Sequence, residues 1–241
     1  RHGNGSSFMT EPTLNHIYNG DCIVGMQSLP DKCIDLVVTD PPYLMGYKTN
    51  RRKDKLHRSC KEIHGDKGAR GRELIESYVK ECYRVLKDDS AMYMFCNSNQ
   101  IEFFVGTVKK AGFKLKNIIV WVKDEHTSGD LKAAFGCQYE FILLLNKGRK
   151  FLKGHRITDV WKFDRVFWRR KLHQNQKPLA LLEQCIKYHS DEGDVVLDGF
   201  MGSGSTAVAA RKMRRNFIGW EIDKEYYDVA IERLQAEEAT M

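Results

Sequence analysis

The sequence predicts an α/β fold with a doubly wound, mostly parallel, Rossmann-like sheet of seven strands and a short inserted segment. Short apolar runs rich in β-branched residues alternate with stretches at helical spacing along the chain. One run, at 33–39, leads into Asp-Pro-Pro-Tyr, and another, at 194–198, leads into a glycine-rich turn. This alternation is typical of parallel sheets that carry ligand sites at the carboxyl ends of their strands.

The predicted elements follow from periodicity and punctuation. Apolar runs indicate strands, in chain order at 16–18, 33–39, 90–96, 113–122, 139–145, 194–198 and 216–221. Apolar residues three or four positions apart indicate helices, at 22–29, 74–86, 101–110, 178–188, about 205–213 and 225–236. Residues 46–72 are polar, basic and aperiodic, which predicts a loop or mobile flap.

Length and composition predict one domain that carries its own core. The chain has 241 residues, of which 1–8 look like residue from an expression vector, with Met9 the expected native start and 9–241 the domain. No apolar run reaches membrane-spanning length, so no membrane partner is expected. The seven cysteines contain no Cys-x-x-Cys pair and no regular spacing. That pattern indicates reduced thiols and a cytoplasmic location rather than a disulfide framework.

The net charge of +7 is concentrated in two segments. Residues 48–72 carry +7 and residues 147–171 carry +8, which leaves −8 for the rest of the chain. Two basic segments on an otherwise acidic chain favour a polyanionic partner, nucleic acid, although ordinary solvated loops could have the same charge composition. The basic residues expected to bind DNA are Arg51, Arg52, Lys53, Lys55, Arg169, Arg170 and Lys171. Aromatic residues interleave the second segment, which fits either base contacts or a small packed subdomain.

Asp40-Pro41-Pro42-Tyr43 closes the strand at 33–39. Proline fixes φ and has no N–H, so this turn is stiff and a backbone carbonyl can point outward beside the Asp40 carboxylate. Tyr43 adds a flat ring for stacking. Two acceptors and a stacking surface suit a planar amine, such as the amino group of a nucleobase taken out of its stack. An ordinary acidic turn at a strand end is the alternative.

The second motif runs from Asp198 to Thr206 and is followed by an acid, Glu221, at the end of the next strand. Glycines at such a turn let the backbone approach a ligand, and a carboxylate about 20 residues later can hold ribose hydroxyls. The layout would also serve NAD. However, the third glycine of G-x-G-x-x-G is missing, which favours a nucleoside cofactor without phosphates, such as S-adenosylmethionine.

With both motifs in hand, the chain resembles the β-class S-adenosylmethionine-dependent amino-methyltransferases of DNA. The resemblance covers about residues 15 to 235, in the order DPPY, recognition segment, cofactor glycines. Its matching pieces are NGDC (19–22), DPPY (40–43), QKP (176–178), VLDGFMGSGST (196–206) and FIGWEID (217–223). It implies a single methyltransferase domain with a target-recognition segment at about 147–172. No metal is expected, because His57, Cys60 and His64 lack zinc spacing.

The resemblance also implies residue roles. Asp21 and Cys22 would lie by the adenine ring of the cofactor, Glu221 would hold its ribose, and Asn175 with Lys177 would meet its methionine carboxylate. The glycine motif would line the rest of the pocket through Asp198, Phe200, Gly202, Ser203, Gly204, Ser205 and Thr206. Two departures stand out. Gly199 replaces the family's usual proline, which is expected to loosen the turn, and HQNQKP (173–178) replaces HPTQKP.

The implied activity is methylation of the N6 amino group of a flipped adenine in double-stranded DNA, with S-adenosylhomocysteine as product. Asp40, Pro41, Pro42 and Tyr43 would form the catalytic motif. Methylation of N4 of cytosine and an RNA adenine target are left open, as are a homodimer and a restriction endonuclease partner in a bacterial or phage setting. From other classes, a nicotinamide-dependent oxidoreductase would lack a hydride-transfer site, and a binding module would not explain the cofactor turn.

Overall fold

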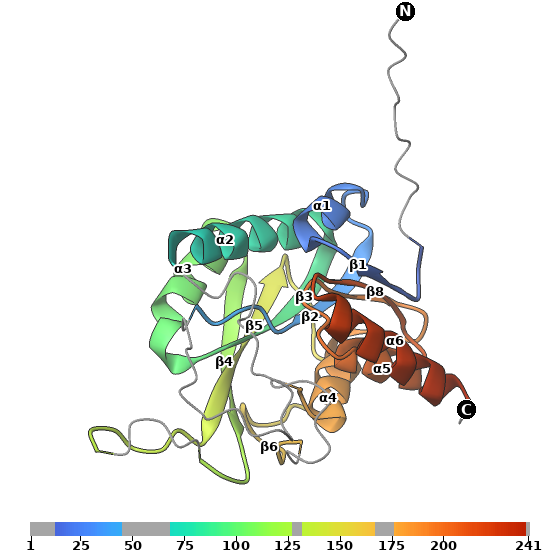
Figure 1. The fold of residues 1–241 in the computed structure, drawn as a ribbon. Helices are drawn as coiled ribbons and strands as arrows, with labels where there is room; N and C mark the ends of the chain where they lie inside the picture. Colours follow the sequence, from blue (N-terminus) through green and yellow to red (C-terminus); the bar gives the residue numbers. More distant parts are fainter. Residues whose placement is uncertain (1–12, 45–67, 127–131, 167–175, 240–241) are drawn as a thin grey trace, which may run out of the picture.

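The structure is a computed structural model that describes residues 13–44, 68–126, 132–166 and 176–239. One sheet in the order β1-β8-β7-β2-β3-β5-β4-β6 runs through the described residues (Figure 1). Its strands are β1 (His16–Asn19), β2 (Ile34–Thr39), β3 (Leu86–Cys96), β4 (Lys114–Val122), β5 (Tyr139–Lys147), β6 (Val160–Lys162), β7 (Val195–Asp198) and β8 (Asn216–Glu221). The predicted α/β class is confirmed, with one correction: the described sheet has eight strands rather than seven.

The additional strand, β6, comes from the segment predicted to recognise the target. It pairs in parallel with β4, with Val120 opposite Val160. Three residues are too few to show a period of two, which is why the sequence did not reveal this strand. β5 is antiparallel to β3 and β4, and the other neighbouring strands are parallel. No helix is described between β4 and β5, and a connection without a crossover helix returns the chain in the antiparallel direction.

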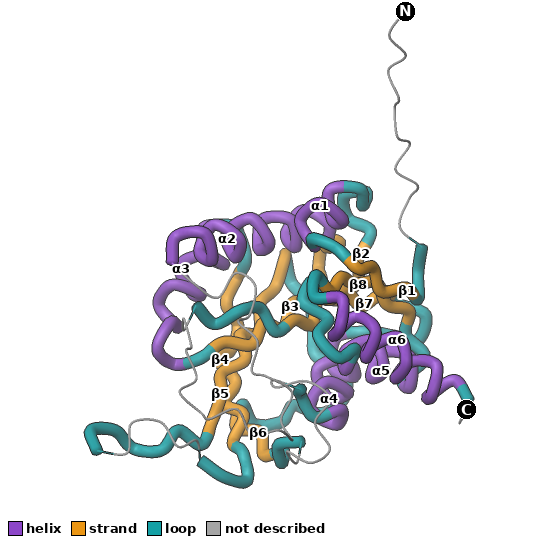
Figure 2. The backbone as a smooth tube through the Cα atoms, in the orientation of Figure 1, coloured by secondary structure: helices purple, strands orange, loops and turns teal. Residues whose placement is uncertain are grey.

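Helices cover both faces of the sheet, which Figure 2 shows in orange between them. The helices are α1 (Cys22–Gln27), α2 (Gly68–Val85), α3 (Ile101–Lys110), α4 (Leu179–His189), α5 (Ser205–Lys212) and α6 (Lys224–Glu238). One buried cluster joins the sheet to α1, α2 and α3, and the other joins it to α4, α5 and α6. The fold is therefore doubly wound. No helix within the described ranges is long and apolar enough to cross a membrane.

The predicted loop at 46–72 needs a correction at its end, because residues 68–72 form the first turn of α2. Gly71 is buried there, and the Arg72 guanidinium lies 4.5 Å from the centre of the Phe103 ring. A charged segment can thus be helical when one side packs against a neighbouring helix. Residues 45–67, with the predicted DNA contacts Arg51, Arg52, Lys53 and Lys55, lie outside the described residues, as do 167–175 with Arg169, Arg170, Lys171 and Asn175.

Candidate active site

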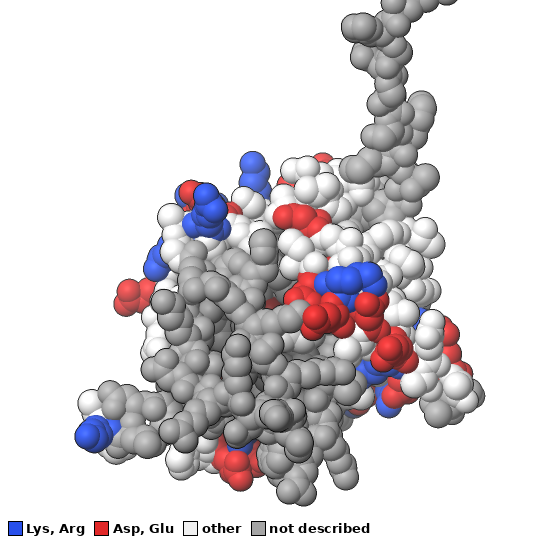
Figure 3. Space-filling view, in the orientation of Figure 1, with Lys and Arg blue, Asp and Glu red and all other residues white. Residues whose placement is uncertain are grey.

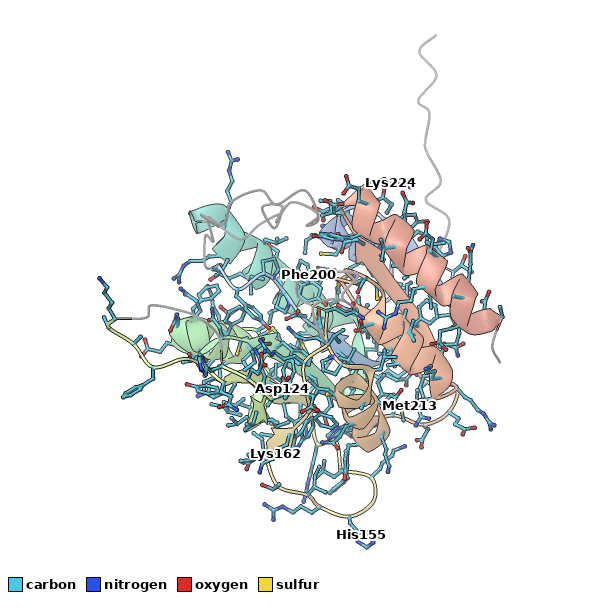
Figure 4. The ribbon with its side chains drawn as sticks, turned by 60° about the horizontal axis from the view of Figure 1, so that its bottom comes forward. Asp124, His155, Lys162, Phe200, Met213 and Lys224 are labelled. Carbon is cyan, nitrogen blue, oxygen red and sulfur yellow. The ribbon has the colours of Figure 1, made fainter. Side chains whose placement is uncertain are left out.

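The two sequence motifs lie side by side at one edge of the sheet. β2 ends at Thr39, directly before Asp40, and β7 ends at Asp198, directly before the glycine turn. These strands are parallel neighbours, with Leu36 opposite Val196. Their carboxyl ends therefore meet at the same edge, which is where open α/β sheets bind their ligands. In Figure 4 the labelled Phe200, which follows β7, lies between α2 and the C-terminal helices.

A buried network ties the two motifs together. The Thr39 hydroxyl donates to the Asp198 carboxylate at 2.9 Å, and the Tyr78 hydroxyl of α2 donates to Thr39 Oγ1 at 3.0 Å. Asp198 also accepts from the Thr206 hydroxyl at 2.7 Å and from the Phe200 N–H at 3.0 Å. Burial raises the pKa of Asp198 to about 6, against the opposing effect of these hydrogen bonds. Both Asp198 oxygens thus bind protein donors and hold the turn in place.

Tyr78 also explains why the turn has glycine at 199. The Gly199 N–H donates to the Tyr78 hydroxyl at 3.0 Å, and a Cβ at this position would lie 2.2 Å from Cε2 of the Tyr78 ring. Proline would lose that hydrogen bond and clash with the ring. Tyr78 thus contacts the turn at the position where the resembling family has proline, and the expectation of a looser turn stays a prediction.

This fit predicts a stability effect. Gly199→Ala is expected to lower the free energy of unfolding by about 1–3 kcal/mol, because the fully buried Tyr78 ring must shift. Gly106→Ala in α3 is the matched control, since nothing lies within 4 Å of its added Cβ and alanine favours helix. Urea unfolding of both variants measures the difference. Equal stability of the two variants would show that Tyr78 does not restrict residue 199.

A pocket opens beside the glycine turn and gathers predicted cofactor residues. It contains about 340 Å³ of empty space, open solvent at its mouth included, and its lining residues are Gly20, Asp21, Cys22, Leu74, Gly199, Phe200, Glu221 and Ile222. Asp21 also caps the N-terminus of α1, where its carboxylate accepts from the Ile23 N–H at 2.7 Å. Burial raises the pKa of Cys22 to about 12, so its thiol is neutral.

The glycine turn is held by Glu221 from the next strand. The Gly202 N–H donates to Glu221 Oε2 at 2.7 Å, and the Asp223 N–H donates to Oε1 at 2.8 Å. Gly202 and Gly204 have φ of 52° and 77°, a region that favours glycine. The turn's hydroxyl residues are buried in the protein: Ser203, Ser205 and Thr206. The predicted contact between Glu221 and a ribose stays a prediction, while its hold on the turn is observed.

Around Asp40 the structure places a cluster of charged side chains from distant parts of the chain. Lys177 Nζ lies 2.7 Å from Asp40 Oδ2, 3.1 Å from Glu140 Oε2 and 3.0 Å from the Tyr43 hydroxyl. The Tyr43 hydroxyl lies 2.6 Å from Asp40 Oδ1 and 2.9 Å from Glu140 Oε2. Lys123 Nζ lies 2.6 Å from the other oxygen, Glu140 Oε1. Lys177 thus stands beside Asp40, and its predicted contact with a methionine carboxylate stays a prediction.

The cluster is electrically balanced, with two carboxylates and two ammonium groups. Burial disfavours the charged form of Glu140, but Lys177 and Lys123 outweigh it and lower its pKa to about 2. Burial raises the pKa of Asp40, with Lys177 opposing that effect. For Lys177 burial acts to lower the pKa, yet the two carboxylates raise it overall. Balanced pairing of this kind is what allows charges to remain in a poorly hydrated site.

Glu140 and Lys123 are the members that the sequence interpretation missed. Glu140 is the second residue of the strand Tyr-Glu-Phe-Ile-Leu-Leu-Leu, and a single acid in an apolar strand was the available signal. Lys123 directly follows β4 and is 9% exposed, which no sequence pattern indicates. Among the described residues no group of three or more His, Cys, Asp or Glu gathers as metal ligands would, and His57, Cys60 and His64 lie outside them.

The described part of the predicted recognition segment contains both a buried and an exposed aromatic residue, so neither of the two alternatives for this segment holds alone. Trp161 is buried in the core, whereas Phe151 is 67% exposed with the Arg149 guanidinium 4.9 Å from its ring centre. The segment therefore contains one aromatic residue that packs in the core, Trp161, and one that is exposed beside an arginine, Phe151. Away from it, Figure 3 shows acidic side chains gathered over α6, in line with the acidic remainder of the chain.

Comparison with known proteins agrees with these motifs. A family model described as DNA methylase, of the N6/N4 type, matches residues 34–232. Protein YubD of Escherichia coli (strain K12) is 34% identical over 231 residues, 95% of this chain and 93% of that protein. Type II methyltransferase M.HpaI of Haemophilus parainfluenzae is 30% identical over 242 residues, 90% and 73% of the two chains. A solved structure of M1.HpyAVI has a TM-score of 0.69 at 26% identity and covers 91% and 98%. The chain belongs to the N6/N4 DNA methylase family, and it is a DNA methyltransferase.

Proposed function

We propose that this enzyme transfers the methyl group of S-adenosylmethionine to the N6 amino group of an adenine flipped out of double-stranded DNA. The observation that carries the proposal is the position of Asp40 and Pro41, which directly follow β2, beside the glycine turn that follows its neighbour β7. Hydrogen-bond acceptors for the target amine and a pocket for the cofactor lie at the same edge of the sheet, so the amine and the methyl donor can be held close together.

The residues at this edge fit the chemistry of an aromatic amine. Its nitrogen lone pair is delocalised into the ring, which makes the amine a weak nucleophile. Hydrogen bonds to the Asp40 carboxylate and the Pro41 carbonyl favour pyramidal nitrogen and stabilise the positive charge that develops on it. Tyr43 stacks on the flipped base and fixes its plane. S-adenosylmethionine supplies an electrophilic methyl group and leaves as S-adenosylhomocysteine.

The pocket beside Phe200 fits a nucleoside cofactor. It joins an apolar wall, from Leu74, Phe200 and Ile222, to the carboxylates of Asp21 and Glu221. The relative M1.HpyAVI is described in complex with S-adenosylmethionine. Asp21, Cys22, Phe200 and Glu221 are therefore assigned to the cofactor, with Asn175, Lys177 and the glycine motif from Asp198 to Thr206 completing the site.

The modified base is tested by exposing unmethylated DNA to the purified enzyme and digesting it to nucleosides. Mass spectrometry is expected to find N6-methyladenine, because the first motif position holds Asp40, which in the resembling family favours adenine. N4-methylcytosine would overturn the choice of base but keep the reaction. Methylation of RNA alone would overturn the DNA substrate. Sequencing the same DNA with modified-base detection identifies the recognised site.

Loss of Glu221 is expected to weaken cofactor binding. Glu221→Ala removes the acceptor of the Gly202 N–H and the proposed partner of the ribose. The dissociation constant of S-adenosylmethionine should rise about tenfold to a hundredfold, the effect of a charged hydrogen bond. Calorimetry measures it, with Glu232→Ala, an exposed acid of α6, as the control. An affinity equal to that of the control would refute this role of Glu221.

The basic segments are proposed to bind DNA phosphates. Neutralising Arg51, Arg52, Lys53 and Lys55 together should weaken DNA binding and reduce the dependence of log K on log salt by about 0.9 per lost phosphate contact. Lys109, Lys110, Lys114 and Lys116 form a matched exposed set. They end α3 and begin β4, at the sheet edge opposite Asp40, so their neutralisation should leave the slope unchanged. Equal slopes for both sets would exclude the loop from the interface.

The remaining features of the proposal concern setting and assembly. A bacterial setting is supported by the relative from Haemophilus parainfluenzae. All six cysteines among the described residues are free thiols, which fits a reducing compartment such as the cytoplasm. M.HpaI is a type II methyltransferase by name, so a companion restriction endonuclease is part of the proposal. A homodimer stays a prediction.

A further inference from the structure

The acceptor that the target amine needs already holds two protein donors. Asp40 Oδ1 accepts from the Tyr43 hydroxyl at 2.6 Å, and Oδ2 lies 2.7 Å from the Lys177 ammonium. An ammonium so close neutralises the carboxylate and opposes the positive charge that methyl transfer builds on the amine. Tyr43 must also leave its hydrogen bond to present its ring to a base. Both donors therefore have to move from Asp40 when the base enters.

One oxygen lies within reach of both donors. Glu140 Oε2 is 2.9 Å from the Tyr43 hydroxyl and 3.1 Å from Lys177 Nζ. The single hydroxyl proton of Tyr43 can be donated to Asp40 or to Glu140, but only to one of them at a time. Lys177 can likewise shift between two carboxylates without losing its counterion. Neither group is left unpaired in a buried site, which would be costly.

Glu140 is held in place for this role. Its other oxygen, Oε1, lies 2.6 Å from Lys123 Nζ, and Lys123 lies 5.1 Å from the centre of the Trp121 ring. Glu140 is the second residue of β5, and the next residue, Phe141, pairs with both neighbouring strands. The side chain of Glu140 is 18% exposed and that of Lys177 is 7% exposed. These two charged groups are therefore paired with protein side chains much more than with water. The Glu140 carboxylate is therefore fixed, and the side chains of Tyr43 and Lys177 are the groups that move.

We propose that Glu140 is a positioning residue that takes the Tyr43 hydroxyl and the Lys177 ammonium from Asp40 when the target base enters. This role rests on the proposed function, because it requires Asp40 to accept the amino group. It gives Asp40 a second state, in which its carboxylate faces the base alone and at full charge.

Two variants test the role by single-turnover methylation with cofactor and DNA both saturating. Glu140→Gln keeps the shape but removes the charge, so Lys177 stays on Asp40. Glu140→Asp keeps the charge, but its shorter side chain places the carboxylate farther from the Tyr43 hydroxyl and the Lys177 ammonium. Each should slow methyl transfer at least about tenfold, the weight of one hydrogen bond to a charged group. Glu76→Gln, an exposed acid of α2, should react at the wild-type rate, and thermal melting confirms that each variant is folded.

A rescue separates positioning from support of the fold. In Glu140→Gln the cluster has one excess positive charge, and adding Lys177→Met restores balance and frees Asp40. The double variant should therefore react faster than Glu140→Gln at saturating cofactor, which a structural defect would not allow. Wild-type rates in both Glu140 variants, or a folded double variant no faster than Glu140→Gln, would overturn the proposal. Activity in Asp40→Ala would instead overturn the proposed function itself, so the two failures are distinguishable.

Discussion

Asp40→Ala is expected to reduce the rate of methyl transfer by at least about 10²–10³-fold, the usual weight of one preorganised group that stabilises charge in a transition state. The variant loses the carboxylate proposed to accept from the amine, and Asp40 is not one of the residues that line the pocket at Phe200 and Glu221. Binding of S-adenosylmethionine should therefore remain close to wild type. Single-turnover methylation and calorimetry measure the two quantities separately.

Asp40→Asn supplies the internal comparison for this prediction. Asparagine keeps one acceptor oxygen but no charge, so its rate should fall between those of the wild type and the alanine variant. An asparagine variant as slow as alanine would show that charge alone matters. Substantial activity in Asp40→Ala would remove Asp40 from the mechanism.

Lys177→Met is expected to produce the largest loss of stability in the site. It leaves Asp40 and Glu140 as two carboxylates that share one remaining ion-pair partner among the described residues, Lys123. Removing one partner of a buried pair typically costs about 3–5 kcal/mol. The Asp40 side chain is 20% exposed, so a value toward the lower end is expected. Urea unfolding measures the loss, and Lys87→Met, which breaks a surface pair with Asp35, should change stability by no more than about 1 kcal/mol.

The same variant has a defined pH dependence. Without Lys177 the pKa of Asp40 in the folded protein rises further above its unfolded value, since burial and Glu140 both raise it. The folded state then binds a proton more tightly than the unfolded state. Stability relative to wild type is therefore recovered as the pH falls and is lost as it rises through the raised pKa. A loss that is constant between pH 5 and pH 8 would mean that Asp40 finds another cation.

Local sequence patterns were sufficient for most of the fold. The helix at 101–110 and the strand at 216–221 are found at their predicted residues. Gly112 marks the end of the helix, and polar turn residues flank the apolar run of the strand. α2 begins at Gly68 rather than Leu74, since the contact of Arg72 with Phe103 comes from another helix. β6 needs β4 as a partner to exist at all. Both differences are tertiary effects.

The site was predictable where its residues follow strands and unpredictable where long side chains meet. Asp40, Asp198 and Glu221 each stand at the end of a parallel strand, so topology brings them together. Lys177 belongs to a motif that the resemblance links to the cofactor, yet its ammonium lies beside Asp40. Glu140 comes from the antiparallel strand, whose start rather than end reaches this edge. No spacing in the sequence encodes such a meeting of side-chain tips.

The contact between Tyr78 and Gly199 links two positions that are expected to change together during evolution. A homologue that carries proline after the strand-ending acid has no N–H to offer a tyrosine hydroxyl and no space for the edge of its ring. Such homologues should carry a smaller or differently directed side chain where this chain has Tyr78. Correlated substitution at these two positions would then divide the family into two groups, one with glycine and tyrosine and one with proline and a different side chain.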